Sequence, residues 1–523
     1  MSDALGQPGL DVLEHAEDVV FDVRTDLDES GLIEAISDYD ALIIRSGTRV
    51  TSDVLDAAPL LRVVGRAGVG VDNVDIEAAT RNGVIVMNTP NANTIATAEH
   101  TMALLLATSR HIAAAHGSMA VGRWERSNYS GQELHGRTLG IIGFGRVGRL
   151  VAARAQAFGM DILAYDPYVS ESIGRETKVT LANLEDVLSG SDYVTLHTSL
   201  SDETRNLMDA ERIALMRDGA VLVNAARGGL VDQSAAAAAL DSGKLKSVGI
   251  DVFPTEPPPS DNPLVGHPKV VHTPHLGAST FEAQRDVAIQ VAEQVISALR
   301  GKQIQNSVNL AFAGDVDFDH VMPYIRLGEK LGKLQFAMAP SGIRSVEIEV
   351  HASDAEDLIR PVAAGVLKGL IDGFMPQTVN YVNAPVLAEE HGIKISRSIG
   401  IDDPDYKNQV MCRVTWEGGE RTVSGVVFGQ DHPRIVQISG YRFEADPSGI
   451  VLMMLNSDVP GVVGQVGTVL GDFGVNIAEW RLGRDLERHE ALSFINLDTK
   501  PSAEALEALR RLPAVEKAIV VEL

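Results

Sequence analysis

The sequence has little cysteine, no excess of positive charge and no long hydrophobic run. Cys412 is the only cysteine in 523 residues, so no disulfide can form within the chain. The formal net charge is −26, and so acidic a surface repels nucleic acid and anionic membranes. No apolar run reaches the roughly 18 residues of a transmembrane helix, and the amino end lacks the features of a secretory signal. We therefore expect a cytoplasmic protein that binds neither nucleic acid nor membranes.

The composition is that of a folded chain with several domains. Hydrophobic residues make up 45% and charged residues 22%, which argues against global disorder. Domains of about 100 to 200 residues would divide a chain of this length into three or four. Cys412 lies in the alternating run 409–416, which predicts a half-buried strand residue rather than a catalytic thiol.

The amino-terminal three hundred residues alternate short β-branched runs with helix-like stretches, the pattern of parallel sheets covered by helices. In the first unit, strands are expected at 19–23, 41–45, 61–65 and 84–87. A long helix at 97–120 leads to a second unit, with strands expected at 136–142, 162–165, 193–196, 220–224, 247–250 and 270–272. An amphipathic helix at 282–299 is expected to cross back to the first unit.

The remainder of the chain reads as two further domains. Residues 310–447 lack Gly-rich phosphate loops and contain expected strands at 346–350 and 421–428 and a helix at 355–373. Residues 449–523 read as strand, helix, two strands, helix and strand. That order is the ferredoxin-like pattern.

A dinucleotide site is predicted where the second unit begins. Gly143-Phe-Gly-Arg-Val-Gly148 follows an expected strand and precedes an expected helix, the context in which these glycines admit a pyrophosphate at a helix amino terminus. Asp166, at the end of the next strand, would accept hydrogen bonds from ribose hydroxyls and repel a 2′-phosphate. NAD is therefore favoured over NADP. A helix cap is the alternative for Asp166.

Three polar side chains follow successive strands of the same unit. Arg227 lies in Asn224-Ala-Ala-Arg-Gly-Gly, Glu256 follows the next strand, and His275 follows the one after it. Carboxyl ends of parallel strands meet at one sheet edge, so these side chains can converge. Oxidation of a 2-hydroxy acid needs such a set, with an arginine for the carboxylate and an imidazole, oriented by a carboxylate, for the proton. Taken singly, Arg227 could be a surface residue and His275 a structural one.

Five segments resemble the D-isomer-specific 2-hydroxyacid dehydrogenase family, and specifically its long, four-domain branch. They are 66–73, 143–148, 224–232, 249–257 and 274–280. The resemblance covers nearly the whole chain. It implies an α/β fold with a Rossmann-type nucleotide-binding domain inserted in a flavodoxin-like substrate domain, then an α+β intervening domain and a ferredoxin-like ACT domain. The implied domains are the substrate domain at 1–92 and 284–308, the NAD-binding domain at 93–283, the intervening domain at 309–447 and the ACT domain at 448–523.

The resemblance also assigns residues, position by position. Arg227, Glu256 and His275 form the catalytic set, and no metal is expected. Asp251 would hold the nicotinamide carboxamide, within a cofactor set of Gly143, Gly145, Arg146, Val147, Gly148, Asp166, Thr198, Ala225, Ala226, Asp251 and Gly277. The substrate set comprises Arg45, Gly68, Val69, Gly70, Asn91 and Arg126. Arg45 would face the substrate phosphate, and Arg126 would reach the neighbouring active site in a dimer. Asp458 and Asn476, with Asn456 as a weaker candidate, would hold L-serine in the ACT domain.

The implied activity is NAD-dependent oxidation of D-3-phosphoglycerate to 3-phosphohydroxypyruvate, the first step of phosphorylated serine synthesis. Feedback by serine and self-association as a dimer or tetramer are implied with it, and reduction of 2-oxoglutarate is compatible with the same site. Two alternatives remain open, namely another D-2-hydroxyacid dehydrogenase and a non-enzymatic, NAD-sensing corepressor.

One feature departs from the family pattern. Relatives carry a strand before the segment that matches Ser2-Asp-Ala-Leu-Gly, whereas this chain begins directly at a turn and helix. In a sheet of this type that strand would be central. The expectation is either that the true start lies upstream or that the substrate domain is incomplete and less stable.

Overall fold

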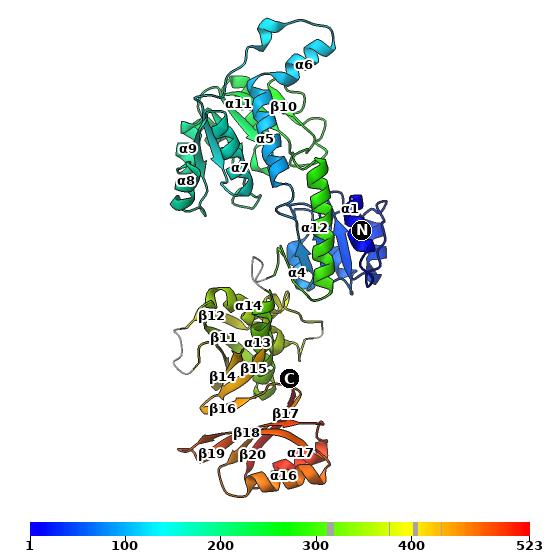
Figure 1. Ribbon diagram of the computed structural model, residues 1–523, viewed down its shortest axis with the longest axis vertical. Coiled ribbons are helices and arrows are strands. Elements are labelled where there is room, and N and C mark those ends of the chain that lie inside the picture. Colours follow the sequence, from blue (N-terminus) through cyan, green and yellow to red (C-terminus); the bar gives the residue numbers. More distant parts are fainter. Residues whose placement is uncertain (311–317, 376, 401–405, 430) are drawn as a thin grey trace.

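The computed structural model describes residues 1–310, 318–375, 377–400, 406–429 and 431–523. Four sheets follow one another along the chain, and the units that carry them form an elongated molecule (Figure 1). Among these described residues, no helix is long and apolar enough to cross a membrane. The fold confirms the predicted class of two α/β units followed by two smaller α+β units.

The first unit has a parallel three-stranded sheet of β1 (Ala41–Ile44), β2 (Val63–Arg66) and β3 (Ile85–Met87). Its helices are α1 (Gln7–Glu14), α2 (Glu29–Ala35), α3 (Ser52–Asp56) and α4 (Ile76–Arg81). A short 3-10 helix, η1 (Ile36–Asp38), follows α2.

The strand predicted at 19–23 is wrong. Ser2 donates its N–H to the Ile43 carbonyl of β1, while Met1 pairs with the far side, donating its ammonium to the Asp22 carbonyl and accepting from the Arg24 N–H. The backbone of residues 22–24 is thus hydrogen-bonded to one residue, Met1, rather than to a strand. The β-branched pattern at 19–23 therefore has no ladder to join.

The second unit is a seven-stranded parallel sheet in the order β10-β9-β8-β7-β4-β5-β6. Its strands are β4 (Thr138–Ile142), β5 (Asp161–Tyr165), β6 (Thr180–Leu181), β7 (Tyr193–Leu196), β8 (Ala220–Asn224), β9 (Leu245–Ile250) and β10 (Val270–His272). Its helices are α7 (Arg146–Ala157), α8 (Glu171–Thr177), α9 (Leu184–Gly190), α10 (Ala210–Leu215) and α11 (Gln233–Ser242). The six predicted strands are confirmed. The order reverses at β4, which places a binding crevice at its carboxyl end.

Two long helices connect the first and second units. The first of them, α5 (Thr94–Ser109), begins the stretch predicted as one helix at 97–120. That stretch breaks into α5 and a separate helix, α6 (Ile112–Ala120), because His111 between them has a left-handed φ of 52°. Helix α6 projects from the body of the molecule (Figure 1). Helix α12 (Phe281–Leu299) crosses back, as predicted, and packs on β2 and α1 through an apolar face that includes Val291 and Val295.

The third unit carries a six-stranded sheet with two long helices. The strands are β11 (Ile343–His351), β12 (Lys394–Ile399), β13 (Gln409–Trp416), β14 (Gly419–Phe428), β15 (His432–Ile438) and β16 (Tyr441–Ala445). The helices are α13 (Phe318–Met338), α14 (Ala355–Ile371) and α15 (Ala384–Glu390). Cys412 lies in β13 as predicted but is fully buried, and burial raises the pKa of its thiol to about 12. The pattern at 318–338 escaped prediction because Pro323 interrupts it.

The fourth unit has the predicted ferredoxin-like order. Its elements are β17 (Ile450–Ser457), α16 (Val462–Asp472), β18 (Ile477–Asp485), β19 (Glu490–Leu497), α17 (Ala503–Arg510) and β20 (Val515–Glu522). The antiparallel sheet has the order β18-β19-β17-β20. Val451, Met453, Leu492 and Phe494 on one face of this sheet join the hydrophobic core of the third unit. The two carboxyl-terminal units are therefore packed against each other.

Candidate active site

The glycine turn after β4 has the shape that a dinucleotide requires. Gly143 has φ 93°, and a Cβ there would lie 2.6 Å from the His197 backbone. A Cβ on Gly148 would lie 2.3 Å from the Gly143 carbonyl, so only glycine lets α7 pack this closely. A Cβ on Gly145 would meet nothing within 4 Å. This open space at the amino end of α7, which begins with Arg146 and Val147, can admit a pyrophosphate.

Asp166 stands beside this turn and binds it. Its Oδ2 accepts a hydrogen bond from the Phe144 N–H at 2.8 Å, and its Oδ1 accepts one from the Tyr168 N–H at 2.9 Å. These bonds are structural but do not make Asp166 the helix cap that was its alternative role, because the N-cap residues of α7 and α8 are Gly145 and Ser170. Each carboxylate oxygen can accept a further hydrogen bond, so the contact with an adenosine ribose stays a prediction.

The other predicted cofactor residues lie along the same edge of the sheet. Thr198 follows β7 next to Gly143, Ala225 and Ala226 follow β8, and Gly277 lies beyond β10. His197, which precedes Thr198, is buried, and burial lowers its pKa to about 3. Because so weakly basic and buried an imidazole is a poor proton acceptor, His197 does not compete with His275 as the base.

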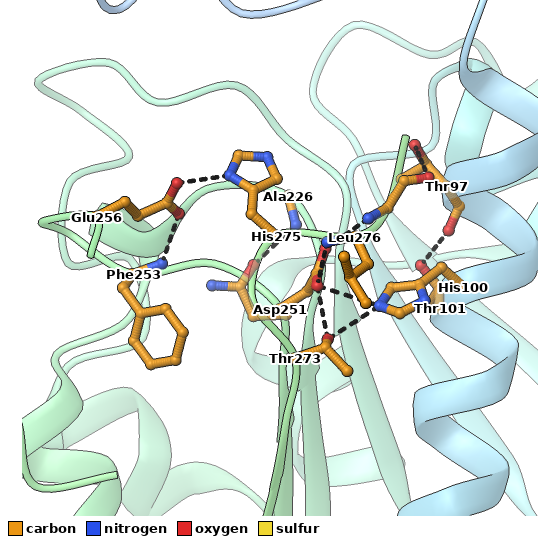
Figure 2. A network of polar contacts seen from close by, with 12 residues as sticks. Thr97, His100, Thr101, Ala226, Asp251, Phe253, Glu256, Thr273, His275 and Leu276 are labelled. Carbon is orange, nitrogen blue, oxygen red and sulfur yellow. Dashed lines mark hydrogen bonds and ion pairs between the residues drawn. The ribbon is translucent and has the colours of Figure 1, made fainter. Parts of the chain in front are cut away.

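His275 and Glu256 are brought together as predicted. His275 Nδ1 and Glu256 Oε2 are 2.6 Å apart, and Glu256 Oε1 accepts from the Phe253 N–H at 3.0 Å (Figure 2). Burial of Glu256 opposes ionisation, but the hydrogen bonds from His275 and Phe253 outweigh it, and its pKa lies below the ordinary value. The carboxylate is therefore charged at neutral pH. With Nδ1 occupied, Nε2 of the half-exposed His275 ring is left to exchange a proton with a substrate.

Asp251 binds the loop that carries His275. Its carboxylate is fully buried and accepts hydrogen bonds from Thr273 Oγ1 and from the N–H groups of Leu276 and Gly277. His100 Nε2 lies 3.1 Å from Asp251 Oδ1. Burial opposes its ionisation, yet these hydrogen bonds hold the pKa of Asp251 below its ordinary value. Its contact with a nicotinamide carboxamide stays a prediction.

Arg227 spans the two amino-terminal units. Its Nε donates to Asp72 Oδ2 of the first unit at 2.9 Å, and its Nη1 donates to the Ala226 carbonyl. A Cβ on Gly70 would lie 1.9 Å from Arg227 Nη2, so the lack of a side chain at Gly70 lets the guanidinium lie directly against the loop Gly68-Val69-Gly70. The predicted substrate loop and the predicted carboxylate ligand therefore face each other.

Arg66 is a site residue that sequence reasoning missed. Its guanidinium packs over Gly68, and its Nε is buried without a hydrogen-bond partner among the described residues. Burial, with the charges of Arg227 and Arg45 nearby, lowers its pKa to about 10. Arg45 in turn donates from Nη2 to Gln284 Oε1 at 2.5 Å. Arg66 ends β2, a strand-end position that could have identified it.

Asn91 and Arg126 are the remaining predicted substrate residues. Asn91 is exposed in the loop before α5. Arg126 begins the short helix η2 (Arg126–Tyr129), which contacts the projecting helix α6 (Figure 1). Its predicted place at the site of a second subunit stays a prediction.

The predicted serine residues do not meet within one chain. Asp458 precedes α16 and pairs with Arg484 at 2.7 Å, whereas Asn476 follows α16 and donates to Asp498 at 2.7 Å. An 11-residue helix of about 16 Å separates them. The weaker candidate, Asn456, is buried and accepts from Ser493. One ligand could touch both Asp458 and Asn476 only where two chains meet.

Three family profiles match successive parts of the chain. They are the NAD binding domain of D-isomer specific 2-hydroxyacid dehydrogenases at residues 102–277, the D-3-phosphoglycerate dehydrogenase intervening domain at 320–439 and the ACT domain at 450–514. Among solved structures, a protein from Thermus thermophilus matches with a TM-score of 0.54 and 34% identity, over 59% of this chain and 98% of that one. An NAD-dependent formate dehydrogenase from Staphylococcus aureus in complex with NAD matches with a TM-score of 0.53 and 30% identity, over 57% and 91%.

Curated relatives match over almost their full length. The D-3-phosphoglycerate dehydrogenase of Methanocaldococcus jannaschii is 37% identical over 100% of this chain and 99% of its own. That of Bacillus subtilis is 38% identical over 93% and 92%, and that of Mycobacterium tuberculosis is 41% identical over 95% and 94%. The chain therefore belongs to the D-3-phosphoglycerate dehydrogenase family, the NAD-dependent D-isomer specific 2-hydroxyacid dehydrogenases that carry an intervening domain and an ACT domain.

Proposed function

We propose that this enzyme oxidises D-3-phosphoglycerate to 3-phosphohydroxypyruvate, the first step of phosphorylated serine synthesis. One observation carries the proposal. Arg45, Arg66 and Arg227 form a cluster of positive charge on an otherwise strongly acidic protein, and burial, followed by the charges of Arg227 and Arg45, lowers the pKa of Arg66. Such a cluster suits a ligand with a carboxylate at one end and a phosphate at the other.

The protein groups divide the work of the reaction between them. Bound NAD supplies the acceptor for the hydride that leaves the hydroxyl-bearing carbon. His275 Nε2 takes the hydroxyl proton, and the Glu256 carboxylate stabilises the resulting imidazolium and fixes the ring. Arg227 would hold the substrate carboxylate beside this base. In the reverse direction the protonated His275 acts as the acid, which is also what reduction of 2-oxoglutarate would require.

The phosphate end of the substrate would lie toward Arg66 and Arg45. Crowding of like charges around Arg66 is unfavourable in the free protein, and a dianion would relieve it. The unpartnered Nε of Arg66 would also gain a charge-assisted hydrogen bond. An unphosphorylated acid such as D-lactate offers neither gain, which favours phosphoglycerate over other 2-hydroxy acids.

Substitution Arg66→Met tests this assignment. We expect kcat/KM for D-3-phosphoglycerate to fall about a hundredfold, because one or two charge-assisted hydrogen bonds are lost. The value of kcat/KM for D-glycerate, which carries no phosphate, should change by less than about threefold. Arg66→Lys keeps the charge and should lie between the two. Wild-type protein that prefers D-glycerate or D-lactate to phosphoglycerate would contradict the proposed function.

We further propose that the enzyme self-associates and that L-serine restrains it through the ACT domain. The arm after α5 exposes Ile112, Met119, Val121 and Trp124, with Trp124 80% exposed, and apolar side chains gathered on a projection support a protein contact. A contact through this arm would carry Arg126 to a second copy. The separation of Asp458 from Asn476 supports a serine site shared by two ACT domains.

Substitution Asn476→Ala tests the regulatory proposal. We expect the serine concentration that halves phosphoglycerate oxidation to rise at least about tenfold, because a side-chain amide contact to a charged ligand is removed. Activity without serine should stay unchanged, since Asn476 lies in the ACT unit, far along the chain from His275. Sedimentation velocity on the same samples reports the assembly state. Wild-type activity that is indifferent to serine would contradict the proposed feedback.

A further inference from the structure

The loop that carries His275 is held in an unfavourable backbone conformation. His275 has φ 56°, in the left-handed region that residues other than glycine seldom adopt. Its own N–H donates to the Asp251 carbonyl at 2.8 Å, and the next two N–H groups, of Leu276 and Gly277, donate to the Asp251 carboxylate. The turn is thus shaped around one buried anion. Its geometry depends on where that anion is held.

His100 holds the anion from a different part of the chain. It lies on α5, and its Nε2 is 3.0 Å from Thr273 Oγ1 and 3.1 Å from Asp251 Oδ1 (Figure 2). The Thr273 hydroxyl has a single hydrogen, which it donates to Asp251 Oδ1 at 2.6 Å. Thr273 must therefore accept from His100. It follows that His100 Nε2 carries a proton and donates it toward both oxygens.

Helix α5 contacts the loop a second time. Thr97, three residues before His100 and so on the same helix face, donates from Oγ1 to the Gly277 carbonyl at 3.4 Å. Helix α5 begins at Thr94, where the chain enters the second unit, and α12 begins at Phe281, where it leaves. The catalytic loop therefore lies between the two helices that connect the substrate and NAD-binding units.

We infer that His100 is a positioning residue that fixes the His275 loop to helix α5 through Asp251 and Thr273. The inference rests on the proposed function, because it concerns the loop of the acid–base residue. His100 touches neither Glu256 nor the Arg45, Arg66 and Arg227 cluster in the contacts above, so its effect should fall on the placement of the base. Substrate binding should be nearly unaffected, whereas NAD binding should weaken, because Asp251 and Gly277 belong to the predicted cofactor set.

Paired substitutions separate the hydrogen bond from the bulk of the ring. His100→Leu fills the space without a donor, whereas the amide nitrogen of His100→Gln can occupy the position of Nε2. We expect kcat at saturating NAD to fall on the order of tenfold to a hundredfold in His100→Leu, with KM for phosphoglycerate within about twofold of wild type. His100→Gln should recover most of kcat. Thr101→Val is the matched control, since the Thr101 hydroxyl donates its hydrogen to Thr97 in its own helix.

Hydrogen exchange gives a readout that needs no turnover. The amides of Leu276 and Gly277 should exchange about tenfold faster in His100→Leu than in wild type, and His100→Gln should restore their protection. If His100→Leu is insoluble, His100→Asn, whose amide is too short to reach Asp251, replaces it. Equal kcat in the donor-free variants and wild type, or equal losses in His100→Gln and His100→Leu, would overturn the inference. If the wild-type enzyme does not oxidise phosphoglycerate, the proposed substrate is wrong. The exchange rates of Leu276 and Gly277 then test by themselves whether His100 positions the His275 loop.

Discussion

Replacement of His275 by alanine should lower kcat for D-3-phosphoglycerate oxidation by about a thousandfold or more. General acid–base catalysis contributes about a hundredfold to ten-thousandfold, and His275 Nε2 is the group left free to take the hydroxyl proton. The ring also links the Glu256 carboxylate to the reaction, so its loss removes the effect of that charge as well. The expected loss is therefore near the upper end of that range. Steady-state turnover above pH 7 measures it.

The cofactor site should survive the same substitution. Gly143 packs against the backbone that follows β7, Gly148 packs against the Gly143 carbonyl, and neither contact involves His275. A titration with NAD, followed by protein fluorescence, should therefore give a Kd within about threefold of wild type. A change of that size corresponds to the loss of at most one weak contact. Unchanged turnover would remove His275 from the chemistry. Loss of NAD binding together with turnover would instead mean that the loop had collapsed.

Glu256→Gln is the matched partner of this experiment. The amide keeps a hydrogen-bonding group near His275 Nδ1 but loses the charge that stabilises the imidazolium. We expect a smaller loss in kcat, roughly tenfold to a hundredfold, by the usual strength of a hydrogen bond to a charged group. Equal losses in the two variants would indicate that Glu256 does more than orient and stabilise the ring.

The parts of the site that sequence could predict are those fixed by one strand and the turn after it. Gly143, Arg227, Glu256 and His275 each follow a strand, and in a parallel sheet that position alone brings them to one edge. The ferredoxin-like order of the fourth unit could likewise be predicted from local sequence. Each of its strands and helices is a short run of its own, bounded by turn residues.

The parts that sequence could not predict depend on what faces a residue from another element. His100 is one of several polar residues in helix α5, and only the fold places Asp251 and Thr273 against it. Arg66 matters because Arg45 and Arg227 approach it from other segments. The strand expected at 19–23 failed for the same kind of reason. Its β-branched residues favour an extended backbone, but a strand also needs a neighbouring strand of matching length to pair with.

Arg227 carries the second large expected effect, because it serves substrate and domain arrangement together. In the free protein its Nε is bound to Asp72 and one hydrogen of its Nη1 to Ala226, which leaves the second hydrogen of Nη1 and those of Nη2, over Gly70, for an incoming carboxylate. Arg227→Ala removes the carboxylate contact and the bridge between the two units. We expect kcat/KM for phosphoglycerate to fall about a thousandfold, as for two charge-assisted hydrogen bonds. NAD affinity should change little.

Arg227→Lys and Asp72→Asn separate the two roles of this arginine, which are binding the substrate carboxylate and bridging the two units. Lysine keeps the charge but cannot offer two parallel N–H groups, so most of the loss in kcat/KM should persist. Asp72→Asn releases the guanidinium from its partner in the first unit, which should leave the carboxylate contact available and lower KM if Asp72 competes with the substrate. Arg217→Ala, at an arginine of the same unit paired with Asp192, serves as the control and should match wild type. A lysine variant with full kcat/KM would contradict bidentate binding, and the substrate carboxylate would then have to be held elsewhere in the cluster.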